Sequence, residues 1–366
     1  MGALSVPIPS RRLECFYRPA ILAGSAAVLL CVFWFASRYP QLMSKAQHVG
    51  QAMPSMTYSH ELVHAAADAP PWEKILFGAV NWLDAMKIGM AFGVLLGALL
   101  HTTLKYYPLK IGKNLYLNSV KGALVGAPMG VCANCAVPAA CGVTRGHGRV
   151  EVALGFLFSS PNFNPVVVMM TFTAFPLVMS VTKYVVLLLV IVLLVPGLIA
   201  WLERREQIKP FTDRDDAASC DLAVPAEDCN ETFWSVLKNL SAEYGKHVWM
   251  LVKPTITLML VASFLSAAIL TLLPWLTLLA QVTPSRAALV SLVSVFMPVP
   301  IALDVMFAAQ LQAQGVASGY VMLFAMTLGT YSIIPTIYLW REVSKKLAVI
   351  LFVFFFAVGW LTGLLF

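Results

Sequence analysis

The chain has 366 residues, of which 59% are hydrophobic and 12% are charged. Soluble domains carry roughly 25% charged residues, so this composition excludes a soluble globular enzyme and indicates a polytopic membrane protein. The net charge of +7 does not indicate a nucleic-acid partner, because the lysines and arginines are spread over short loops between apolar segments and form no single basic face.

Seven apolar segments are long enough to cross a bilayer as a helix, which takes about 20 residues. They cover residues 20–37, 83–104, 150–174, 177–202, 248–273, 318–340 and 347–366. Two further apolar segments, 122–143 and 287–309, contain glycine, proline and polar residues near their centres. A helix loses backbone hydrogen bonds at such a centre, so both segments are interpreted as broken.

The first apolar segment is preceded by Arg11, Arg12 and Arg18, as in a secretory signal peptide. Its apolar run lacks a small-x-small cleavage pattern, which favours an uncleaved anchor helix. Because basic residues are enriched in cytoplasmic loops, we expect the N-terminus in the cytoplasm. Residues 1–74 would then comprise an anchor helix and an exterior loop that begins at Arg38.

The broken segment 122–143 has basic residues on both of its sides. These flanking residues are Lys105, Lys110, Lys113, Lys121, Arg145, His147 and Arg149. Both flanks should lie in the cytoplasm, so the segment would enter and leave the membrane on one side as a re-entrant hairpin. Its tip is predicted at residues 132–138. The first repeat would span residues 75–202 and be followed by a cytoplasmic loop over 203–246.

The second half of the chain repeats this series. If segment 287–309 crossed the membrane once, the basic cluster at 341–346 would lie outside. A second hairpin with its tip at Pro298 and Pro300 returns that cluster to the cytoplasm, so that residues 247–366 form an inverted second repeat. The predicted fold class is an all-α polytopic membrane protein, an inverted-topology repeat with two re-entrant hairpins and one extra N-terminal helix. Such repeats are typical of secondary transporters, which bind substrate near the bilayer midplane.

The predicted first tip region carries the cysteines Cys132, Cys135 and Cys141 together with Pro138. Thiolates are soft ligands that select thiophilic partners such as Cu(I), Zn or trivalent arsenic centres. If Cys132 and Cys135 share one helical turn, both sulfurs face the same point. Two other interpretations stay open, because cysteine is often a small buried hydrophobe and Cys-x-x-Cys is also the spacing of dithiol oxidoreductases.

A second polar break is expected after the first hairpin. Residues 159–165 contain two prolines and the uncharged polar residues Asn162 and Asn164. Backbone groups freed at such a break can bind ions or polar substrates, so we expect both asparagines opposite the Cys132 tip. An ordinary proline kink is the alternative. The expected partners from the second half are Thr330, Tyr331 and Ser332.

Ionisable side chains within apolar segments are costly to bury and are therefore candidates for function. Here they are Asp84, Lys87, Lys253 and Asp304. Asp304 follows Pro300 in the second hairpin, where a carboxylate could take up a coupling proton. Alternatively, Asp304 is an interfacial residue because the hairpin arm is short.

The run His60-Glu61-Leu62-Val63-His64 matches the zinc-protease signature H-E-x-x-H. In a helix, this spacing places His60 and His64 on one face as metal ligands. A metalloprotease is a remote alternative, because the run falls in a short exterior loop that ends in two prolines, and no convincing third ligand follows.

Segment 126–168 contains the cysteine-rich turn, Pro138, the turn at 145–146 and the run Phe-Leu-Phe-Ser-Ser-Pro-Asn-Phe-Asn-Pro at 156–165. In these features it resembles the bacterial predicted-permease family that includes organoarsenical efflux permeases. That family commonly shows Cys-Ser-Cys-Gly-x-x-Pro, whose first and last residues correspond to Cys132 and Pro138. Its second cysteine falls on Asn134 here, and Cys135 is displaced by one. The resemblance therefore implies the fold and the transporter class better than an arsenical substrate.

These features together predict a secondary-active permease of the bacterial cytoplasmic membrane that moves a small solute, with a thiophilic metalloid, organometalloid or sulfur compound as the leading candidate. The resemblance implies export. A membrane thiol-disulfide redox enzyme is the alternative; no cofactor and no nucleic-acid partner is expected, and a homodimer is left open. Asp304 is the coupling-ion candidate. The predicted substrate contacts are Cys132, Asn134, Cys135, Pro138, Asn162, Asn164, Thr330, Tyr331 and Ser332.

Overall fold

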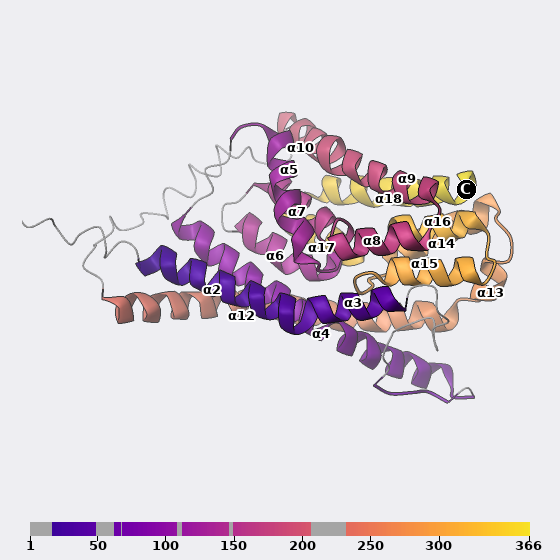
Figure 1. Ribbon diagram of the computed structural model, residues 1–366, viewed down its shortest axis with the longest axis horizontal. Coiled ribbons are helices and arrows are strands. Elements are labelled where there is room, and N and C mark those ends of the chain that lie inside the picture. The colour runs from indigo at the N-terminus through magenta and orange to yellow at the C-terminus, as the bar shows by residue number, and fades with distance from the viewer. Residues whose placement is uncertain (1–16, 49–61, 67, 108–111, 146–148, 206–231) are drawn as a thin grey trace, which may run out of the picture.

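The structure is a computed structural model that describes residues 17–48, 62–66, 68–107, 112–145, 149–205 and 232–366 (Figure 1). Within these ranges the regular elements are helices. Those of the N-terminal segment and first half are α2 (Tyr17–Phe33), η1 (Trp34–Arg38), α3 (Tyr39–Gln47), α4 (Pro71–Tyr106), α5 (Leu115–Gly126), η2 (Ala127–Met129), α6 (Ala133–Arg145), α7 (Val150–Asn162), α8 (Pro165–Ala174), α9 (Leu177–Leu189), η3 (Val190–Leu194) and α10 (Val195–Arg204). Those of the second half are α12 (Phe233–Leu272), α13 (Trp275–Leu278), α14 (Pro284–Phe296), α15 (Leu303–Ala313), α16 (Ser318–Thr327), α17 (Ile333–Tyr338), η4 (Leu339–Val343) and α18 (Lys345–Leu365).

Five of the described helical segments are long and apolar enough to cross a membrane, and the pair α7 and α8, bent by 48° at its break, can be counted as a sixth. This confirms an all-α polytopic membrane protein. The prediction of a continuous span over 318–340 was wrong, because α16 and α17 are separated by Leu328 to Ser332. Gly329 and the polar residues Thr330 and Ser332 interrupt the apolar run there, and they make contacts that a continuous helix would not permit. The five continuous segments are Tyr17–Gln47, Pro71–Tyr106, Leu177–Arg204, Phe233–Leu272 and Lys345–Leu365.

The two halves contain the same series of elements: a long helix, a helical hairpin, a broken helix pair and a closing helix. The long helices α4 and α12 pack against each other in antiparallel directions, as Figure 1 shows. Near the start of α4, Gly78 faces Ala267, and near its end Lys105 pairs with Glu243. The halves also exchange contacts reciprocally, since α17 packs on α6 and α8 packs on α15. This reciprocal packing is what two copies of one unit in opposite orientations would make.

Both hairpins turn where the helix is interrupted. In the first hairpin, the turn between α5 and α6 contains Gly130, whose φ is 60°. Residues 133–138 already belong to α6. The predicted tip at 132–138 was therefore placed a few residues too late. Pro138 lies within α6, where it removes the N–H that would bond to the carbonyl of Asn134 and places its ring against that carbonyl. The second turn lies at 297–302, around the prolines expected there, and ends at Ala302 with φ of 62°.

The extra N-terminal helix is longer than predicted. It continues without interruption through η1 and α3 as far as Gln47, so the expectation of an exterior loop beginning at Arg38 was wrong. Pro40 lies inside this continuous helix, directly after the π-helical turn η1, where the regular α-helical pattern of backbone hydrogen bonds is already altered. Arg38 and Leu42 are buried against the rest of the protein. The additional helical turns thus bury Arg38 inside the protein, whereas the prediction had placed it at the start of an exterior loop.

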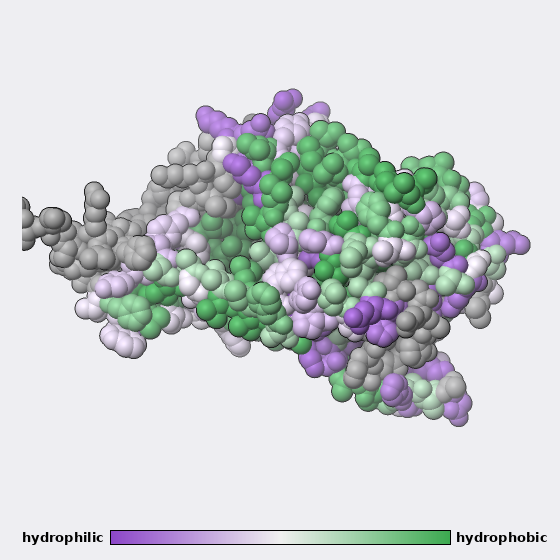
Figure 2. Space-filling model, viewed as in Figure 1, coloured by the Kyte–Doolittle hydropathy of each residue, from purple (hydrophilic) through white to green (hydrophobic). Residues whose placement is uncertain are grey.

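An apolar surface covers α9 and α10 (Figure 2). On α9 alone, Leu177, Val181, Val185, Leu188 and Leu189 are exposed. Soluble proteins rarely expose contiguous apolar patches of this kind, whereas lipid-facing helices do so as a rule. This surface is consistent with a helix at the lipid boundary.

Helices α4 and α6 approach each other through a row of glycines. Gly89, Gly93 and Gly97 repeat every four residues on α4 and present a surface without side chains to α6. A Cβ atom on Gly93 would lie 2.1 Å from the carbonyl oxygen of Cys135, and one on Gly97 would lie 2.2 Å from that of Pro138. These contacts determine how close the start of α6 lies to α4.

We expect Gly93→Ala to lower the free energy of unfolding by about 1–3 kcal/mol, because the added methyl group forces α4 and α6 apart. Unfolding of the detergent-solubilised protein, followed by far-UV circular dichroism, measures this loss. Gly197→Ala is the matched control, since nothing lies within 4 Å of a Cβ atom at that position on α10. Equal stability of the two variants would show that the row of glycines does not determine the packing.

Candidate functional site

The turns of the two hairpins are in direct contact. Asn134, in the first turn of α6, donates a hydrogen bond from Nδ2 to the carbonyl oxygen of Val299, at 3.1 Å. The neighbouring carbonyl of Pro298 accepts from Trp82 Nε1 of α4 at 2.8 Å and from Ser266 Oγ of α12 at 3.3 Å. The two long helices therefore hold the second turn against the first.

Polar side chains from the helix breaks surround this contact. Ser332 Oγ donates to Oδ1 of Asn134 at 2.6 Å, and Thr330 Oγ1 donates to Oδ1 of Asn162 at 3.2 Å. All four side chains are buried. The structure thus brings the break between α16 and α17 together with both the first hairpin and the break between α7 and α8. We call Asn134, Asn162, Val299, Thr330 and Ser332 the junction.

Two of the predicted site residues have other contacts. Asn164 caps α8, since its Oδ1 accepts from the backbone N–H of Val166 at 3.1 Å. Tyr331 stacks on Phe355, with ring centroids 4.8 Å apart, and does not extend toward the asparagines. The structure therefore places Asn164 beside the junction and Tyr331 in the surrounding apolar core.

The three cysteines do not form one cluster. Cys132 and Cys135 are joined by a disulfide and are buried beside the junction, where Cys132 Sγ lies 3.8 Å from Sδ of Met86. Cys141 is a free, partly exposed thiol further along α6. The expectation of three neighbouring thiols was wrong for Cys141, because α6 continues as a helix and carries it away from the first turn. In the described part of the chain, no group of three or more His, Cys, Asp or Glu side chains could hold a metal ion.

Asp304 lies in the first turn of α15 and forms a buried ion pair with Lys183 of α9, with Oδ2 and Nζ 2.7 Å apart. It is thus not an interfacial residue. Asp304 also lies against the second helix break, since a Cβ atom on Gly329 would come within 2.8 Å of its carboxyl carbon. Sequence reasoning missed Lys183, although a lone lysine inside an apolar span is itself a pointer to a functional site.

The other ionisable candidates lie away from the junction. Asp84 and Lys87 pair with each other on α4, and Lys87 is exposed. Lys253 lies over the ring of Trp249, 5.1 Å from its centroid, on the exposed side of α12. Of the H-E-x-x-H run, His60 lies outside the described residues, while His64 is within them.

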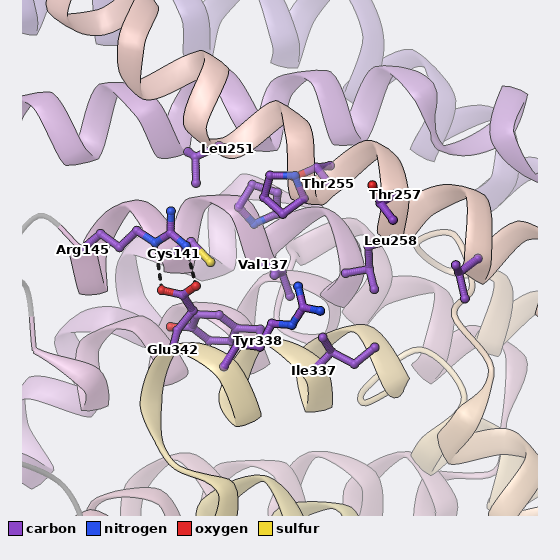
Figure 3. A pocket seen from close by; sticks show the side chains of 14 residues that line it. Val137, Cys141, Arg145, Leu251, Thr255, Thr257, Leu258, Ile337, Tyr338 and Glu342 are labelled. Carbon is purple, nitrogen blue, oxygen red and sulfur yellow. Dashed lines mark hydrogen bonds and ion pairs between the residues drawn. The ribbon is translucent and has the colours of Figure 1, made fainter.

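A cavity of about 360 Å³ lies between α6, α12 and the segment α17–η4 (Figure 3). Val137 and Pro138, which follow the junction residues on α6, line it together with Cys141. Arg145 and Glu342 extend toward each other at one end, where Arg145 Nε donates to Oε2 of Glu342 at 2.8 Å. The same helix that supplies Asn134 therefore also forms a wall of this cavity.

Comparison with known proteins identifies relatives. The family described as predicted permease matches residues 79–366. UPF0718 protein YraQ of Escherichia coli (strain K12) is 30% identical over 103 residues, which is 28% of this chain and 30% of that protein. The alignment thus covers less than a third of that relative. No solved structure matches.

The buried ion pair of Lys183 and Asp304 yields a test of stability. Removing one partner leaves a buried charge unpaired, so we expect Lys183→Met alone to lower the free energy of unfolding by about 3–5 kcal/mol. The double variant Lys183→Met with Asp304→Asn should recover most of this loss. Unfolding in detergent measures both variants.

The exposed pair of Asp84 and Lys87 is the matched control for this comparison. Lys87→Met should change the free energy of unfolding by less than about 1 kcal/mol, because solvent already screens that pair. If Lys183→Met were as mild as this control, Lys183 and Asp304 would not form a buried pair.

Proposed function

Because this chain belongs to the family of predicted permeases, we propose that it is a secondary-active permease that binds its solute at the junction. The single observation that carries this proposal is the contact between the two hairpin turns, where Asn134 bonds to Val299 and Ser332. Transporters built from inverted repeats place their solute sites where interrupted helices from both halves meet. At the junction, uncharged polar groups meet in an otherwise apolar interior.

The proposed transport mechanism is alternating access, in which the solute site opens to one side of the membrane at a time. The cavity between α6 and α12 is the approach from the cytoplasm, since its end at Arg145 and Glu342 adjoins the basic residues that the positive-inside rule places there. The other α6 residues that line the cavity, Val137, Pro138 and Cys141, lie along the helix between Arg145 and the junction residue Asn134. Movement of one half against the other would close this approach and open the opposite one. On this account the protein lies in the bacterial cytoplasmic membrane with its N-terminus inside.

The sulfur atoms of Cys132 and Cys135, which form a disulfide in the structure, are the reason for proposing a thiophilic solute. Cys132 lies two residues before Asn134, directly ahead of α6, and Cys135 lies one residue after it, in the first turn of that helix. Both are buried. If a cellular dithiol reduces the Cys132–Cys135 disulfide and is itself oxidised to a disulfide, the two released thiols would contact a metalloid or sulfur-containing solute, because thiolates prefer soft partners. Export is the direction implied by the likeness to efflux permeases.

The ion pair of Lys183 and Asp304 supports coupling to protons. A carboxylate at the first turn of a helix inside the protein can be neutralised by a proton, and this would release Lys183. Because Asp304 lies against Gly329, protonation of Asp304 would directly change the packing of the helix break that contributes Thr330.

Transport into inside-out vesicles tests the junction. We expect Asn134→Ala to reduce uptake of the transported solute at least tenfold, because both hydrogen bonds across the halves are lost. Cys132→Ser should reduce uptake of arsenite or methylarsenite but not of a solute without affinity for thiols. The panel would include these two compounds with sulfite and thiosulfate.

Cys31→Ser is the control for the same assay, since Cys31 is an exposed thiol on α2. Full activity of Asn134→Ala on every solute transported by the unaltered protein would refute the junction as the site. In the double variant of Lys183 and Asp304 described above, the transport that remains should no longer depend on a proton gradient.

The accessibility of Cys141 tests the orientation of the cavity. In a variant that retains only this cysteine, we expect a membrane-impermeant methanethiosulfonate reagent to modify Cys141 from the cytoplasmic side, because the thiol lines the cavity. Inside-out and right-side-out vesicles, followed by mass spectrometry, separate the two sides. Modification only from the exterior would contradict the proposed orientation.

A further inference from the structure

Buried positive charge accumulates around the junction. Lys45 of α3 donates from Nζ to the carbonyl of Ile301 in the second hairpin turn at 2.7 Å, and Lys183 pairs with Asp304 just beyond it. Lys45 lies within electrostatic reach of both Asp304 and Arg38. Lys183 and Lys45 therefore share the carboxylate of Asp304, and Arg38 is a further cation near Lys45.

Arg38 is the least compensated of these cations. Its side chain is 6% exposed, and no carboxylate among the described residues pairs with it. The guanidinium lies over the ring of Phe33, 4.9 Å from its centroid, and makes a long hydrogen bond of 3.4 Å to Gln41. Its Nε atom is buried and has no hydrogen-bond partner. A buried, unpaired guanidinium is strongly unfavourable unless an anion accompanies it.

The position of Arg38 connects it to the first hairpin turn. A Cβ atom on Gly89 would lie 3.1 Å from a terminal nitrogen of Arg38 and 2.8 Å from Sγ of Cys135. The guanidinium and the sulfur therefore both border the same point on α4. A Cβ atom on Gly130 would in turn lie 3.4 Å from Cγ of Arg38.

Two helix N-termini add to the positive potential. Helix α6 begins at Ala133 and α15 begins at Leu303, and the hydrogen bond from Asn134 to Val299 joins the two starts. The N-terminal end of a helix carries partial positive charge and unsatisfied N–H groups. No side chain caps α15, whose Ncap residue is Ala302.

We propose that Arg38, with Lys45 and Lys183 nearby, binds a small oxyanion at the junction, and that the solute of the permease is such an anion. This inference rests on the proposed function and specifies its substrate class. The guanidinium supplies planar donors that match an oxyanion. In their reduced form, Cys132 and Cys135 beside it would favour an oxyanion that also contains a soft atom, such as thiosulfate or a metalloid oxyanion.

Arg38 and Lys45 precede the residues matched by the permease family, which begin at residue 79. Family membership therefore says nothing about these two cations. An anionic solute would be a property that the N-terminal helix adds to the permease scaffold.

The test uses the full-length protein in phosphatidylcholine nanodiscs. Sulfate, thiosulfate and arsenate are the probes, with chloride holding the ionic strength constant. Calorimetry gives affinity, and the midpoint of thermal unfolding reports stabilisation by the bound anion. We expect at least one probe to raise the midpoint of the unaltered protein, and Arg38→Gln to weaken its binding at least tenfold.

Two further variants make the result specific. Arg38→Lys keeps the charge but loses the planar donors, so its affinity should fall between those of the unaltered protein and Arg38→Gln. Lys253→Gln removes an exposed cation on α12 and should change nothing. The proposal is overturned if no probe binds, if Arg38→Gln binds as the unaltered protein does, or if only phosphatidylglycerol in the nanodisc stabilises the protein.

Failure of this inference can be distinguished from failure of the proposed function. If a neutral solute such as arsenous acid is transported in an Asn134-dependent manner and no anion binds, the permease remains and the oxyanion is refuted. If an oxyanion binds through Arg38 but no solute is transported, the anion site remains and the permease is refuted.

Discussion

The hydrogen bond between Asn134 and the carbonyl of Val299 joins the two places where the hairpins stop being helical. Interrupted backbone within a bilayer must find its partners inside the protein. Here two carbonyls of the second turn accept from side chains, that of Val299 from Asn134 of the first hairpin and that of Pro298 from Trp82 and Ser266 of the long helices. The side chains of Asn162 and Thr330 join the two helix breaks across the halves. Neither half can move against the other unless these bonds are replaced, and a polar solute at the junction could replace them.

The contacts of Asn134 explain what an asparagine provides at a position where the motif implied by the resemblance has a cysteine. A cysteine at this position would offer one weak donor and a weak acceptor. The amide instead donates to Val299 and accepts from Ser332 at the same time, so it connects three segments. Compared with the motif that the resemblance implies, Asn134 thus supplies a hydrogen-bonded cross-link in place of a soft ligand, and Cys132 and Cys135 place two sulfurs beside it.

Much of the fold follows from local properties of the sequence, whereas the charges of the site do not. Apolar length and loop charge predict the long helices and both hairpins, because these depend on the partition of short segments between lipid and water. Lys183 sits in an apolar run, and its partner Asp304 is 121 residues away, so only the tertiary contact shows the pair. Arg38 follows an apolar run and was predicted to end it, since nothing local indicates that burial would carry the helix on to Gln47.

The proposed solute site therefore combines two sets of residues, the junction and the cations near it, which come from different parts of the chain. The asparagines and hydroxyls belong to the inverted halves, and they can bond to many polar solutes because amides and hydroxyls both donate and accept. Arg38 and Lys45 come from the additional helix, and they can only donate and only favour negative charge. If, as proposed, the solute binds here, the uncharged groups would determine where it fits and the charged groups which solutes are repelled, so the sign of the solute would depend on the helix that precedes the repeats. One permease scaffold could in this way be adapted to solutes of different charge without altering the contact between its hairpins.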